Sequence, residues 1–147
     1  MLNRLGADEL ACRVAGDGAR SLVDAWASAD PDGRVAIAIW NGTLDQTKAA
    51  GDVALDRLIS LTIRGLAGAT YEVRHHRVDA RHSNIARTWE SLGRPAWPDV
   101  DGWARLRAAD RLETLGPSRR VTVDGGAVEL SFELPMPAMS LIELVPG

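Results

Sequence analysis

The chain has 147 residues, of which 46% are hydrophobic and 25% charged, a balance typical of one folded domain spanning residues 1–147. Its formal net charge of −3 argues against a nucleic-acid partner, and no apolar stretch approaches the roughly 20 residues that cross a membrane. The single cysteine, Cys12, excludes an intrachain disulfide, and the N-terminal residues lack the apolar core of a signal peptide, so we expect a cytoplasmic protein.

Most apolar runs are short and end at glycine, proline, aspartate or asparagine, which is typical of β-strands. Asp30-Pro31-Asp32-Gly33 predicts a tight turn, and Asp124-Gly125-Gly126 predicts a hairpin turn. The run VAIAIW at 35–40 is almost wholly apolar, so we expect both faces of that strand to be covered. The strands are predicted at residues 10–14, 21–27, 35–40, 57–63, 70–78, 119–123, 127–134 and 139–145.

The segment from Arg81 to Leu115 departs from this pattern, because its apolar residues recur at helical spacing. We expect a first helix that Ser83 or Asn84 caps and that ends near Gly93, then a rigid Pro-containing connector and a second helix. The apolar positions that define the two helices are Ile85, Trp89, Leu92, Trp103, Leu106 and Leu112. The sequence therefore predicts a mainly β fold, an immunoglobulin-like two-layer antiparallel sandwich with a two-helix excursion near residues 81–112.

Three histidines, His75, His76 and His82, are close in sequence and raise the question of a metal site. Adjacent strand residues point to opposite faces, so His75 and His76 do not easily hold one ion. The lone Cys12 offers no partner at zinc-site spacing. We therefore expect no metal ion and no other cofactor.

Carboxylates are the next candidates for chemistry. Glu129 and Glu133 share a face of one predicted strand, about 13 Å apart at about 3.3 Å per residue. Retaining glycosidases need two carboxyl groups about 5–5.5 Å apart, so this pair is expected to be a solvated strand face. The sequence also contains no nucleophile elbow, phosphate loop or dinucleotide fingerprint.

Five tryptophans are many for a chain of this length. Trp97 and Trp103 lie in the least regular segment and are candidates for a platform on which a sugar ring stacks. Trp89 is on the apolar stripe of its helix and is expected in the core, while Trp26 and Trp40 are expected to pack on their strands.

A more specific pattern follows the fifth predicted strand. It comprises Arg77-Val78-Asp79, then His82-Ser83-Asn84, Trp89 within the helix, and Gly93-Arg94-Pro95 as a stop. This pattern resembles the C-terminal region of glycoside hydrolase family 39, the family of bacterial β-xylosidases and α-L-iduronidase. The strand that ends in Trp40-Asn41 and the final pair of strands resemble further parts of that region, so the resemblance covers nearly the whole chain.

In that family a (β/α)8 barrel holds both catalytic glutamates, with the acid/base in an Asn-Glu dipeptide, and a β-sandwich packs against the barrel. This chain contains no Asn-Glu and is shorter than the about 250 residues of such a barrel. The resemblance therefore implies the accessory sandwich alone, without catalytic residues and inactive by itself. It also implies a retaining, β-xylosidase-like parent in carbohydrate degradation, with its barrel as the partner of this domain and a homo-oligomer as a possible assembly.

The residues Asp79, His82, Ser83 and Asn84 stand where a strand passes into a helix, so we expect them to form a structural junction. The leading hypothesis is a non-catalytic domain that supports the barrel. The alternative is an autonomous carbohydrate-binding module that uses exposed tryptophans. Without a barrel, some apolar surface is expected to be exposed and to favour self-association, with the VAIAIW strand as a contributor.

Overall fold

The computed structural model describes residues 1–147, except for the side chain of Leu2. The order of elements is five strands, two α-helices and three strands, which confirms the sequence prediction. Three short 3-10 helices accompany them: η1 (Leu2–Arg4), η2 (Gln46–Lys48) and η3 (Val53–Leu55). The strands are β1 (Asp8–Leu10), β2 (Val23–Ala29), β3 (Val35–Asn41), β4 (Arg57–Arg64), β5 (Thr70–Val78), β6 (Arg119–Thr122), β7 (Ala127–Leu134) and β8 (Ala138–Pro146).

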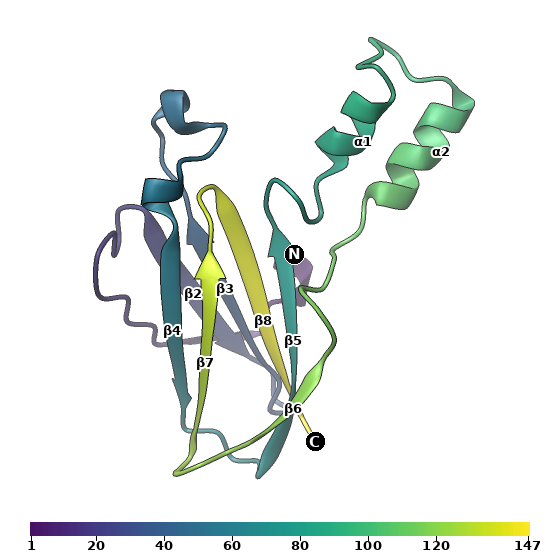
Figure 1. Cartoon of the computed structure of the whole chain (residues 1–147). Helices are drawn as coiled ribbons and strands as arrows, with labels where there is room; N and C mark the ends of the chain where they lie inside the picture. Colours follow the sequence, from purple (N-terminus) through teal and green to yellow (C-terminus); the bar gives the residue numbers. More distant parts are fainter.

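The strands form two layers of unequal size. Six of them make one antiparallel sheet in the order β1-β2-β3-β8-β5-β6, and β4 pairs with β7 as a two-stranded ribbon in front of it (Figure 1). The main core lies between the layers. It includes Ile37, Ile39, Val73, Ile142 and Leu144 from the large sheet and Ile63, Val128, Leu130 and Leu134 from the ribbon. The predicted two-layer sandwich is confirmed.

Strand β3 is covered on both faces, as its apolar sequence predicts. One face contributes to the main core, while Ala36 and Ala38 join Leu141 in a smaller cluster on the outer face of the large sheet. The N-terminal segment and Leu112, which follows the second helix, cover that cluster. The expectation that VAIAIW adds exposed apolar surface is therefore wrong, since its first five residues are at most 7% exposed.

The two helices, α1 (Ile85–Ser91) and α2 (Val100–Ala109), form a hairpin that projects from the end of β5 away from both sheets (Figure 1). Asn84 Oδ1 accepts from the amide of Ala86 at 3.1 Å, so Asn84 and not Ser83 caps α1. Within α1 and α2 only Gly102 and Leu106 are buried. No helix in the described part of the chain is long and apolar enough to span a membrane.

Two tryptophans are more exposed to solvent than expected. Trp26 is 43% exposed. It pairs with Ala38 and so lies on the outer face of the large sheet, but it is not part of the small cluster that the N-terminal segment covers there. Trp89 is 38% exposed, because its short helix meets no large core. Its indole N–H instead donates to the carbonyl of Pro95 at 3.1 Å and holds the connector to α1. Trp40 is half-buried.

Candidate functional site

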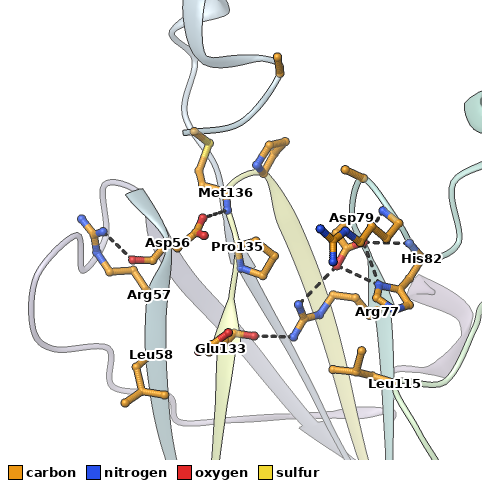
Figure 2. Close-up of a pocket in the computed structure, with 14 residues that line it drawn as sticks. Asp56, Arg57, Leu58, Arg77, Asp79, His82, Leu115, Glu133, Pro135 and Met136 are labelled. Atoms are coloured by element: carbon orange, nitrogen blue, oxygen red, sulfur yellow. Dashed lines mark hydrogen bonds and ion pairs between the residues drawn. The ribbon is translucent and has the colours of Figure 1, made fainter. Parts of the chain in front are cut away.

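A cavity of about 800 Å³ opens at the end of the sandwich from which the hairpin departs. It lies between the β4–β7 ribbon, the turn that follows β7, and the passage from β5 to α1 (Figure 2). Its polar lining includes Arg77, Asp79 and His82 on one side and Glu133 across the cavity (Figure 2). The cavity therefore gathers charged residues from both layers of the sandwich.

Arg77 is the most buried charged side chain of this cavity, at 2% exposure. Its Nε donates to Ser140 Oγ at 3.0 Å, and its Nη2 donates to the carbonyl oxygen of Glu133 at 2.7 Å. Its Nη1 lies 3.5 Å from Asp79 Oδ2. Burial lowers the pKa of Arg77 while Asp79 opposes that shift, and a guanidinium stays protonated in proteins. Arg77 thus links β5 to β8 in its own sheet and to β7 in the ribbon.

Asp79 has a side chain that is 8% exposed and surrounded by donors. Its Oδ1 accepts from the amide of Arg81 at 2.7 Å, from the amide of His82 at 2.8 Å, and from His82 Nδ1 at 2.9 Å. Burial alone would raise the pKa of Asp79, but these hydrogen bonds outweigh it and hold the pKa below its ordinary value. The group is an ionised acceptor at neutral pH and does not serve as an acid catalyst there.

A second set of bonds closes the base of the hairpin. Ser83 Oγ donates to the carbonyl of Arg77 at 2.6 Å and accepts from the amide of Glu113 at 2.8 Å. In return, the amide of Ser83 donates to Glu113 Oε2 at 2.7 Å. Ser83 has a φ of +50°, a left-handed conformation that a non-glycine residue adopts at some cost. The reciprocal pair therefore fixes a strained residue and joins the chain before α1 to the chain after α2.

The structure brings Asp79, His82 and Ser83 together at this junction, and Asn84 follows them as the cap of α1. Their structural role stays a prediction until the residues are replaced. Sequence reasoning missed Glu113, because its partner Ser83 is 30 residues away and no local pattern marks the pair.

A buried carboxylate on the outer face of the large sheet was also missed. The side chain of Glu143 is 5% exposed and accepts from Arg4 Nη1 at 3.0 Å and from Arg34 Nη1 at 3.1 Å. His76 Nε2 lies 2.9 Å from the same carboxylate. These contacts tie the N-terminal segment and the β2–β3 turn to the centre of the sheet. The available signal was a glutamate within the otherwise uncharged strand AMSLIELVP.

The neighbouring histidines lie on opposite faces of β5, as alternation along a strand requires. His75 faces the inside, with its ring edge-on to Phe132 at 4.6 Å and Nε2 2.9 Å from Ser140 Oγ. Burial and, after it, the charge of Arg77 lower the pKa of His75 to about 4, so the ring is neutral at pH 7. Within the described residues, no group of three or more His, Cys, Asp or Glu side chains is placed to hold a metal ion.

The two candidate platform residues are neighbours on the hairpin. The rings of Trp97 and Trp103 meet edge to face, with centroids 5.6 Å apart and planes inclined by 72°. Trp97 is 80% exposed, whereas Trp103, a residue of α2, is half-buried. Only Trp97 therefore presents most of its ring to solvent.

Solved structures of glycoside hydrolases contain the same arrangement of strands and helices. A GH39 enzyme from Xanthomonas axonopodis pv. citri matches with a TM-score of 0.66 at 20% identity, over 84% of this chain and 26% of that one. A monomeric β-xylosidase from Caulobacter crescentus CB15 matches with a TM-score of 0.68 at 22% identity, over 99% of this chain and 29% of that one. This chain shares the fold of one part of these enzymes.

A bacterial orthologue of human α-L-iduronidase matches in the same way, with a TM-score of 0.64 at 21% identity, over 89% of this chain and 23% of that one. The chain thus spans less than a third of the length of the enzymes that it matches. No family model and no curated protein matches the sequence. The resemblance to family 39 is confirmed at the level of the fold.

Proposed function

We propose that this chain is an accessory β-sandwich domain of a family-39-like glycoside hydrolase and that its role is to support a catalytic barrel. One observation carries the proposal: 84% of this chain matches a GH39 enzyme and 99% matches a β-xylosidase, and the matches cover only 26% and 29% of those enzymes. The parent enzyme is proposed to act on β-xylosides, as the name of the Caulobacter protein suggests.

The carboxylates of the chain favour support over catalysis. A retaining glycosidase needs a nucleophile and an acid/base about 5–5.5 Å apart across the bond that is cleaved. Asp79 and Glu143 each hold several donors in structural contacts, and Glu129 and Glu133 are exposed positions of β7. These arrangements support a domain that stabilises a neighbour and does not itself cleave a glycoside.

A chimera tests the supporting role. The chain would replace the matched segment of the β-xylosidase from Caulobacter crescentus CB15, because the alignment covers 99% of this chain. We expect a soluble chimera that cleaves nitrophenyl β-xyloside. A matched control carries an unrelated β-sandwich of the same length in that position and is expected to be insoluble or inactive. A chimera that behaves no better than this control would contradict the proposal.

The isolated chain offers a second test. We expect no turnover of nitrophenyl β-xyloside above a buffer blank. The proposal of a non-catalytic domain would be wrong if activity co-purified with the chain and disappeared when one of its own carboxylates was replaced.

Self-association of the isolated chain is also proposed, because apolar side chains remain exposed on both layers. Trp26 on the large sheet is 43% exposed and Leu58 on the ribbon is 71% exposed. Such surface favours contact between copies when no other domain covers it. Light scattering that gives a strict monomer at high protein concentration would contradict this part.

A further inference from the structure

We propose that the helical hairpin binds one sugar ring of a neutral glycan in the cavity beside Trp97, with Trp97 as the stacking platform. Arg107 and Asp110 are the groups that would bond the hydroxyls. The site is separate from the buried clusters of the sandwich, and the inference does not rest on the proposed function.

Trp97 is held in place but hardly covered. Its edge-to-face contact with Trp103, at 5.6 Å between centroids, orients the ring while 80% of the residue stays exposed. A large aromatic ring that is exposed and already oriented loses little freedom when a flat ligand stacks on it. A pyranose ring is such a ligand, because its C–H face is apolar and its hydroxyl groups lie at its edge.

Helix α2 supplies the rest of the site from one face. Trp103, Leu106 and Arg107 are spaced at i, i+3 and i+4, so their side chains lie together along the helix, and Asp110 follows as its C-cap residue. With Ile85 and Trp97 they line a cavity of about 390 Å³. This volume lies within the range of about 300–1,000 Å³ for small-ligand sites, at the end that suits one ring.

The two polar groups of the cavity select the chemistry of the ligand. A guanidinium only donates hydrogen bonds and a carboxylate only accepts them, so a ligand that satisfies both must offer an acceptor to Arg107 and a donor to Asp110. Sugar hydroxyls meet this requirement, whereas an anionic ligand would be repelled by Asp110 and a cationic one by Arg107.

Both polar side chains are free to meet a ligand. Arg94 of the same hairpin pairs with Glu90 at 2.6 Å, and Arg105 reaches Ser91. The side chains of Arg107 and Asp110, by contrast, form no ion pair or hydrogen bond with any other side chain that the structure describes.

The test is a titration of the 147-residue chain with xylohexaose and with cellohexaose, followed by tryptophan fluorescence and by calorimetry. We expect saturable binding that Trp97→Ala weakens by about tenfold or more, since truncation of an aromatic anchor removes much of the binding energy. Trp97→Phe should restore part of the affinity, and Arg107→Ala should lower it without changing the fold. Trp26→Ala is the matched control, because it removes an indole that is 43% exposed on a distant strand, and it should bind as the wild type does.

The absence of saturable binding to both oligosaccharides would overturn the proposal. So would an equal loss of affinity in the Trp26→Ala control. Sedimentation of the same proteins tests whether the cavity is instead a contact between two copies of the chain. If the wild type is a dimer, Trp97→Ala is a monomer and neither protein binds the oligosaccharides, the proposal is wrong.

Discussion

The sandwich and the hairpin are stabilised in different ways. In the sandwich, β3 and β8 are buried on both faces, and each layer covers the apolar side of the other. In the hairpin only Gly102 and Leu106 are buried, and large side chains such as Trp97 and Val100 are 80% and 85% exposed. The sandwich is therefore held by its own core, while the hairpin depends on where its two ends are fixed.

Helix length explains this dependence. Helices α1 and α2 have 7 and 10 residues, and isolated helices shorter than about 12–15 residues are marginal in water. The Ser83–Glu113 pair and the caps at Asn84 and Asp99 compensate for the missing core. Local opening of the hairpin is thus expected to need less free energy than unfolding of the sheets.

The largest effect is expected from the buried charge of the sandwich. Glu143→Ala leaves Arg34 and His76 without their shared partner in a site where Glu143 is 5% exposed. Breaking a buried pair in this way typically costs about 3–5 kcal/mol, so urea unfolding should show a marked loss of stability. The control Glu129→Ala, on the exposed face of β7, should change the free energy of unfolding by less than about 0.5 kcal/mol. Equal effects of the two variants would show that the Glu143 cluster does not stabilise the fold.

The next effect concerns the junction between the two regions. Asp79→Ala removes the acceptor of three donors and should lower the free energy of unfolding by about 1–3 kcal/mol. His82→Ala should cost less, because that side chain is 33% exposed. Thermal melts of both variants that coincide with the wild type would refute the structural role of the junction.

The stability of the sandwich is expected to depend on pH through the buried His75 ring. His75 has a pKa of about 4 in the fold against 6.5 ordinarily, so between these values the unfolded chain binds a proton that the folded ring does not. The contribution of the neutral His75 ring to the free energy of unfolding is therefore fully present above pH 6.5. It is lost as the pH decreases toward 4, by roughly 1–2 kcal/mol once the partial exposure of the ring is considered. In His75→Gln, the midpoint of urea unfolding should change less between about pH 7 and pH 5 than it does in the wild type. An unchanged slope in this variant would assign the dependence to other groups.

The smallest global effect is expected from the hairpin itself. Asp99 Oδ1 accepts from the amide of Gly102 at 2.7 Å, and loss of such a cap costs about 0.5–2 kcal/mol of helix stability. Because we expect α2 to open before the sheets do, Asp99→Ala should speed amide hydrogen exchange within the hairpin and leave the global urea midpoint unchanged. A lower global midpoint would mean that hairpin and sandwich unfold as one unit.

The local contacts of the candidate site could be predicted from the sequence, and the long-range ones could not. Asp79 and His82 are three residues apart at a strand end, so the sequence alone places them within reach of each other. Trp97 and Trp103 share a short segment, so the sequence names both, but only the structure reveals that Trp97 alone is exposed. The expected burial of Trp26 and Trp89 is wrong because burial depends on what covers a strand or helix, which local periodicity does not report.

The sequence by itself determined the order of the elements and the buried nature of β3, because apolar periodicity and turn residues act over a few positions. Only the tertiary structure decided which charges are buried together. Glu143 meets Arg4 across 139 residues, Arg34 across 109 and His76 across 67. No local pattern encodes such separations, since the two guanidinium groups and the His76 ring reach one carboxylate only after the sheet has formed and the N-terminal segment has folded over its outer face.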